Sequence, residues 1–280
     1  MKTWRPSISS PYLFKLISNP ITKPQVQSFS QGKTSDRNED YFASNENSFV
    51  LADGVTDKSG RKYEGQTGGE IVSRLIVNEA LESALNGAVL IAYLNHKIYD
   101  LYENLHIVGD ITDPRYRFAA TCIAVRIVGN QVTITHVGDS GFRINGHEVY
   151  WGDGQAYDEC AEARAKYIAE TGDVAGSREH IMPLLLKQYD YQNNPDQPRG
   201  FGIIDGTGTP DKFIKTFVYP LSEIKTIEFF TDGYRLIPEG TELAEWENAY
   251  QQVEREDPDK WRTYKATKSR DDRTIAIIKF

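Results

Sequence analysis

Acidic residues lie at the ends of several apolar segments of this 280-residue chain. Taken singly, each is more typical of a turn than of a binding site, because Asp-Gly is a common turn pair. Taken together, carboxylates that meet at one edge of a sheet would repel one another unless cations lie among them. Oxygen ligands without histidine or cysteine favour Mg²⁺, Mn²⁺ or Ca²⁺ over zinc. The acidic residues are Asp53 after "SFVLA", Asp139 after "ITHVG", Asp232 after "IEFFT", Asp271 and Asp272 before "RTIAIIKF", and Glu39 and Asp40 in "RNEDYF".

The tetrapeptide Gly138-Asp139-Ser140-Gly141 has three interpretations. It is the sequence around the nucleophile of chymotrypsin-like serine proteases, it suits an ordinary turn, and it suits a turn whose aspartate binds a metal. A serine protease also needs a histidine base that an aspartate orients. The sequence lacks the histidine motif upstream and the Gly-Pro that normally follows this tetrapeptide, so the protease is a remote alternative.

Composition places limits on location and partners. A net charge of −8 argues against broad affinity for nucleic acid or anionic membranes, so we expect neither partner. Two cysteines, Cys122 and Cys160, are too few for a disulfide framework and are interpreted as structural. The N-terminal segment lacks the apolar run of a secretory signal, and other apolar runs are far shorter than the roughly 20 residues that span a bilayer. We therefore expect a cytoplasmic protein.

Apolar periodicity and turn residues predict a mixture of strands and helices. Thr67 with Glu70 forms a capping box that starts a helix, which Gly87 is expected to end. Residues 192–212 are rich in Gly, Pro, Asn and Asp and are interpreted as a mobile loop, a candidate flap. The other expected elements are strands at 25–30 and 48–53, a helix with an apolar stripe over 90–105, an antiparallel meander over 119–151, a helix at 158–170, strands at 214–219 and 225–232, a helix at 243–253 and a strand at 274–280.

Meanders without strict alternation of strand and helix favour an α+β fold with mostly antiparallel sheets, and two such sheets could cover each other. We expect a single domain over residues 1–280. It has an irregular N-terminal segment over about 1–24 and a flap-like insertion over about 151–212.

Five motifs in order, "RNED", "ADG", "VGDSG", "TDG" and "SRDDRT", resemble the signature of the metal-dependent serine/threonine protein phosphatases of the type 2C family. The resemblance extends from Gln25 to Phe280. It implies a four-layer αββα sandwich, with two mostly antiparallel sheets flanked by helices and two metal ions at one edge. The implied activity is hydrolysis of phosphoserine and phosphothreonine on proteins by direct attack of a metal-bridging water.

The resemblance also implies roles for single residues. Asp53 would bridge two Mg²⁺ or Mn²⁺ ions, and Gly54 would bind through its backbone carbonyl. Such a metal pair can lower the pKa of a bridging water far below its ordinary value, toward about 7. The remaining implied ligands are Asp232 and Asp271 for the second ion, Glu39 and Asp40 in the inner or water-mediated shell, and Asp139 for the third, weaker ion that some members bind.

Two positions depart from the family pattern. Val55 stands where many members have a histidine, and Ser35 stands where the family usually has a phosphate-binding arginine. Lys33 or Arg37 is a candidate replacement, and Arg37 is preferred because its planar fork can bind two phosphate oxygens. The basic run 260–270 is either a solvated face or a segment that attracts a phosphorylated substrate.

The altered arginine position leaves a second function open, a catalytically weak or inactive phosphatase-like domain that binds phosphoproteins or has a regulatory role. For the active phosphatase, the expected partners are a phosphorylated protein substrate and a cognate serine/threonine kinase. The protein itself is expected to be a monomer.

Overall fold

The computed structural model of the protein describes residues 23–56, 58–152 and 158–280. The expected irregular segment over about 1–24 lies almost wholly outside these residues. None of the helices that the structure describes is long and apolar enough to cross a bilayer.

Two five-stranded sheets form the centre of the molecule. The first has the strand order β1-β10-β9-β6-β7 and the second the order β2-β3-β4-β5-β8, and neighbouring strands are antiparallel. The strands are β1 (Gln25–Gln31), β2 (Asp40–Ser44), β3 (Ser48–Asp53), β4 (Cys122–Val128), β5 (Gln131–Val137), β6 (Gly141–Ile144), β7 (Glu148–Trp151), β8 (Lys215–Pro220), β9 (Thr226–Phe230) and β10 (Arg273–Lys279).

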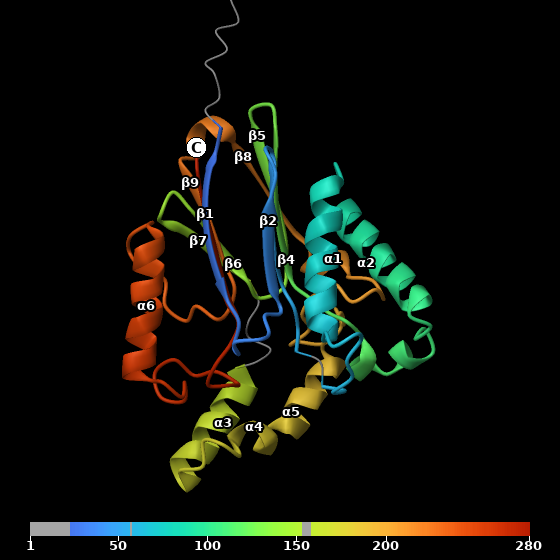
Figure 1. The fold of residues 1–280 in the computed structure, drawn as a ribbon, viewed down its shortest axis with the longest axis vertical. Coiled ribbons are helices and arrows are strands. Elements are labelled where there is room, and N and C mark those ends of the chain that lie inside the picture. Colours follow the sequence, from blue (N-terminus) through green and yellow to red (C-terminus); the bar gives the residue numbers. More distant parts are fainter. Residues whose placement is uncertain (1–22, 57, 153–157) are drawn as a thin grey trace, which may run out of the picture.

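Helices cover the outer faces of both sheets (Figure 1). Helix α6 lies against the first sheet, and α1 and α2 lie against the second. The predicted α+β fold, a four-layer αββα sandwich, is confirmed. Three further helices, α3 to α5, lie beneath one edge of the sandwich (Figure 1). The helices are α1 (Gly68–Glu82), α2 (Gly87–Asn104), α3 (Asp158–Thr171), α4 (Ser177–His180), α5 (Met182–Lys187) and α6 (Leu243–Glu256).

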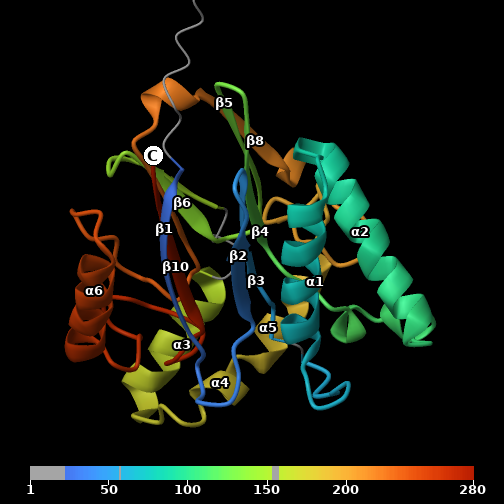
Figure 2. The same cartoon turned by 45° about the horizontal axis from the view of Figure 1, so that its top comes forward.

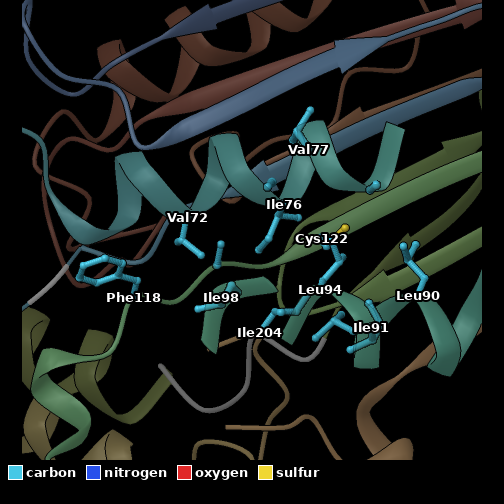
Figure 3. Close-up of a cluster of buried hydrophobic side chains, with 14 of the residues drawn as sticks. Val72, Ile76, Val77, Leu90, Ile91, Leu94, Ile98, Phe118, Cys122 and Ile204 are labelled. Carbon is cyan, nitrogen blue, oxygen red and sulfur yellow. The ribbon is translucent and has the colours of Figure 1, made fainter. Parts of the chain in front are cut away.

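Strands buried on both faces hold the four layers together. In β3, Phe49 and Leu51 point into the core between the sheets, while Val50 and Ala52 pack in the cluster beneath α1 and α2. This division follows from the two-residue period of a strand. Figure 3 shows the helix-facing cluster, where side chains from both helices interdigitate. Each large apolar side chain buried there contributes about 1.5–3 kcal/mol.

Helix α1 begins as predicted and ends earlier than predicted. Thr67 is the N-cap, and its capping box with Glu70 is complete. The helix ends at Glu82, and Gly87 is instead the first residue of α2. Gly87 has φ +58°, which suits a glycine, and its N–H donates to the Thr135 hydroxyl at 2.7 Å.

The turn at Asp139 differs from the predicted meander. Strand β5 pairs with β4 and β8, whereas β6 pairs with β7 and β9 in the other sheet. The chain therefore crosses between the sheets at residues 138–140, and this crossing places Asp139 at their shared edge. Strand β2 was not predicted, although it pairs Asp40 directly with Asp53.

Residues 192–212 pack against the second sheet. Ile204 forms backbone hydrogen bonds with Ala120 in both directions, and Asp205 is fully buried. The interpretation of this stretch as a mobile flap stays a prediction. Glycine and proline composition indicated a loop, but it carried no information about the backbone hydrogen bonds that the loop forms.

The buried Arg164 joins α3 to the loop between α6 and β10. Its Nη1 donates to the carbonyl oxygens of Asp259, Lys260 and Ala266 at 2.9–3.1 Å. Its Nη2 donates to the Ser269 hydroxyl at 2.7 Å. One side chain therefore sets the position of the segment that leads into Asp271.

Replacing Arg164 by Met should lower the free energy of unfolding by about 3 kcal/mol or more, because several buried carbonyls would lose their donor. Lys166→Met, which changes an exposed side chain of the same helix, is the matched control and should stay within about 0.5 kcal/mol. Urea unfolding measures both. Equal midpoints for the two variants would contradict the role of Arg164.

Candidate metal centre

The pairing of strands brings the ends of β3 and β9 and the starts of β2 and β10, which carry or adjoin predicted acidic residues, to one edge of the sandwich. This is the lower edge of the two sheets in Figures 1 and 2. Asp40 and Asp53 face each other as partners in β2 and β3. Strand β9 ends at Phe230, just before Asp232, and its neighbour β10 begins just after Asp271 and Asp272. Residues far apart in sequence thus meet because the strands run in register.

Charge repulsion acts among five of these carboxyl groups. Burial, and then the charges of Asp40, Asp232, Asp139 and Asp271, raise the pKa of Asp53 well above its ordinary value. Burial and Asp272 raise the pKa of Asp40 to about 8, and burial and Asp232 raise that of Asp139 to about 7. The protein alone therefore disfavours full ionisation of the cluster.

The donor set fits a hard divalent cation. Asp40 is 3% exposed, its Oδ2 accepts a hydrogen bond from the Thr231 hydroxyl at 2.8 Å, and its buried Oδ1 has no protein partner. An orphaned buried carboxylate oxygen among other carboxylates suits an ion that takes oxygen ligands. Across residues 23–56, 58–152 and 158–280, no three acidic, histidine or cysteine side chains already form a ready-made metal shell.

Gly54 sits where no side chain would fit. A Cβ atom at this position would lie 2.4 Å from the Gly69 carbonyl oxygen and 2.6 Å from that of Glu39. The backbone after β3 therefore passes close to the start of α1. The Gly54 residue also lines the pocket described below.

Two cations pair with members of the acidic cluster. Arg235 Nη2 lies 3.0 Å from Asp232 Oδ2, and Lys268 Nζ lies 2.5 Å from Asp271 Oδ1. Burial lowers the pKa of Lys268, but the charges of Asp271, Asp232 and Asp53 outweigh it and raise that pKa overall. Arg235 was not predicted as a site residue, although it lies three residues after Asp232 in "TDGYR".

Glu39 lies behind the cluster with protein partners on both oxygens. Its Oε1 accepts from the Thr67 hydroxyl and its Oε2 from the Thr56 hydroxyl, both at 2.6 Å. Lys33 forms ion pairs with Glu39 Oε2 and, at 3.0 Å, with Asp272 Oδ2. Burial alone would raise the pKa of Glu39, but the Lys33 charge and these hydrogen bonds have the opposite and larger effect, so the net shift of this pKa is downward.

A pocket of about 130 Å³ opens beside the cluster, and neither Lys33 nor Arg37 is among its lining residues. Arg37 instead lies 3.7 Å from the exposed Asp36. The sequence prediction that Arg37 or Lys33 binds phosphate stays a prediction. The charged residues that line the pocket are Asp53, Asp139, Asp158, Asp232, Asp271, Lys58, Arg178, Arg235, Lys265 and Lys268.

Ser140 does not have the surroundings of a protease nucleophile. Its side chain is 1% exposed, and its hydroxyl pairs with the Thr121 hydroxyl at 3.0 Å. The His136 ring contacts the Ser140 carbonyl oxygen at 2.8 Å. A hydroxyl buried in this way cannot meet a peptide substrate, whereas the neighbouring Asp139 lines the pocket.

The described residues form an antiparallel αββα sandwich with carboxylates that line a pocket at one edge. A sequence model of the family described as Protein phosphatase 2C matches residues 30–266. The chain therefore belongs to the protein phosphatase 2C family. The match ends before Asp271, so the place of that residue in the family pattern rests on the motif "SRDDRT".

Solved structures share the fold at low sequence identity. The serine/threonine phosphatase PstP/Ppp of Mycobacterium tuberculosis is 14% identical, with 92% of this chain and 98% of that chain covered and a TM-score of 0.51. Stp1 of Staphylococcus aureus is 17% identical, with coverages of 91% and 94% and a TM-score of 0.50. The catalytic domain of PstP, solved in complex with two manganese ions, is 14% identical, with coverages of 91% and 97% and a TM-score of 0.50. The sequence matches no curated protein.

Replacing Lys33 by Met should lower the free energy of unfolding by about 3 kcal/mol, because two buried carboxylates would lose their shared cation. Arg37→Met removes a cation that pairs with an exposed carboxylate and should cost at most about 0.5 kcal/mol. Chemical denaturation of the two variants measures the difference. If Lys33→Met proves as stable as Arg37→Met, the ion pairs of Lys33 do not support this edge.

Proposed function

We propose that this protein is a metal-dependent phosphatase that hydrolyses phosphoserine and phosphothreonine on proteins. The observation that carries the proposal is the convergence of Asp53, Asp139, Asp232 and Asp271 on one pocket, from both sheets. Family membership supports the reaction class, and the absence of histidine and cysteine from the cluster supports Mg²⁺ or Mn²⁺.

The residues that would hold two ions are those on the pocket wall, and Asp53 would be a ligand of both. When bound, the ions supply charge that activates a water molecule and neutralises the phosphoryl oxygens. The proposed ligands are Asp53, the carbonyl of Gly54, Asp232 and Asp271, with Asp139 for a third ion and Glu39 and Asp40 behind them.

The chain's own residues orient this centre. Thr231 fixes one oxygen of Asp40, and Thr56, Thr67 and Lys33 fix Glu39. These contacts restrain Glu39 at both carboxylate oxygens and Asp40 at one. Such preorganisation lets the pocket stabilise developing charge without rearranging during the reaction.

A binding module without turnover is the second candidate function. The specific observation in its favour is Ser35, which is exposed and stands where the family usually has its phosphate-binding arginine. In either case a phosphorylated protein is the proposed partner, and for the active enzyme a serine/threonine kinase would supply it. We also propose that the protein acts as a monomer.

Purified protein should hydrolyse p-nitrophenyl phosphate and a phosphothreonine peptide with added Mn²⁺ and lose this activity in excess EDTA. Asp53→Asn should reduce turnover at least about a hundredfold, because a neutral ligand weakens charge stabilisation by several kcal/mol. Asp36→Asn changes an exposed carboxylate outside the pocket and should retain wild-type rates.

Full activity in EDTA would refute the metal requirement. Unchanged kinetics of Asp53→Asn would refute the role of that residue. Peptide binding by the wild type without any turnover would support the binding module instead.

A further inference from the structure

Lys268 and Arg235 lie in the acidic pocket itself. We propose that they form the phosphate-binding site of this chain, exchanging their carboxylate partners for the phosphate of the substrate. The inference rests on the proposed function and adds the residues that bind the substrate's phosphate. In this scheme Asp271 and Asp232 would bind the metal ions, and Lys268 and Arg235 would bind the phosphate of the substrate.

Position and exposure support this role. Both cations line the pocket, together with the carboxylates that they bind. The Lys268 side chain is 27% exposed and that of Arg235 is 23% exposed. These side chains are therefore open enough to meet a solute and close enough to the cluster to act on the same phosphoryl group.

Other cations near the pocket are engaged elsewhere. Lys33 binds Glu39 and Asp272 outside the pocket wall. Lys265 pairs with both oxygens of Glu162 at 2.8 Å. Arg178 donates to the Thr267 carbonyl at 2.9 Å. Lys268 and Arg235 differ from these three because they line the pocket and pair with carboxylates, Asp271 and Asp232, that line the same pocket.

The backbone around Lys268 is held on both sides. Arg164 binds the carbonyl of Ala266 and the hydroxyl of Ser269, and Lys260 Nζ donates to the Ser269 carbonyl at 2.7 Å. Asp257 accepts four backbone N–H groups from residues 261–264 in the same loop. Exchange of partners by Lys268 therefore needs a side-chain rotation and no movement of the loop.

The exchange predicts that removing Lys268 changes metal affinity and phosphate affinity in opposite directions, which a purely structural role of Lys268 would not. In the wild type, the Lys268 ammonium competes with a divalent cation for Asp271. Removing it should strengthen metal binding, because the carboxylate loses a competing partner. It should also weaken phosphate binding, because the phosphate loses a charge-assisted hydrogen bond. A variant that only damaged the fold would weaken both.

Calorimetric titration of the full chain tests this, first with Mn²⁺ alone and then with inorganic phosphate on the Mn²⁺-loaded protein. Lys268→Met should bind Mn²⁺ about threefold more tightly, a factor typical of a partly exposed ion pair. It should bind phosphate about tenfold more weakly. Lys166→Met should match the wild type in both, and Lys268→Arg should restore phosphate binding.

Arg235→Met provides the same test at the second cation and should give the same pair of opposite changes. If Mn²⁺ and phosphate affinities in Lys268→Met are both unchanged or both weakened while the wild type binds Mn²⁺ and turns over phosphopeptide, the exchange is overturned and the proposed function stands. If the wild type neither binds Mn²⁺ nor hydrolyses phosphomonoesters, the proposed function fails and the exchange fails with it.

Discussion

Repulsion among carboxylates at one sheet edge is the constraint on which the arrangement of this molecule depends. The buried strands fix where each acidic residue lies, and the pKa values of Asp40 and Asp53 rise because burial and neighbouring charges oppose ionisation. Hydrophobic burial in the layers on either side supplies the free energy that holds like charges together. Cations from two different loops then bind Asp232 and Asp271.

The edge is also tied to the helices around it. Glu39 accepts a hydrogen bond from the hydroxyl of Thr67, which caps α1. Lys33 forms ion pairs with both Glu39 and Asp272, which lies at the start of β10. On the opposite side, Arg164 connects α3 to the loop that carries Lys268. Buried polar side chains thus fix three segments relative to the pocket: the start of α1, the start of β10 and the loop that carries Lys268. Buried polar networks of this kind specify one arrangement when each member has a partner.

Local signals in the sequence predicted much of this fold. Apolar runs located β3, β9 and β10, and the capping box located the start of α1, because these depend on neighbours in sequence. The strand ends at Asp53 and Asp232 followed from the same runs. The double-sided burial of β3 and β10 also explains why their sequences are almost continuously apolar.

Non-local features were beyond the reach of the sequence. Strand β2 is short and carries Asp40 at its start, so its pattern resembles a loop. The crossing at Asp139 has turn residues like those of a hairpin, and only pairing with β9 shows that the chain changes sheets. The position of the loop that carries Lys268 depends on Arg164, which is distant from that loop in sequence.

The most direct test of the acidic edge as a metal centre is a crystal structure of the full chain grown with Mn²⁺, with diffraction data collected at the manganese absorption edge. Anomalous difference peaks beside Asp53, with Asp232 and Asp271 as further ligands, are the predicted result. Data that show no peak at this edge at saturating Mn²⁺, or peaks only at other sites on the surface, would contradict the assignment.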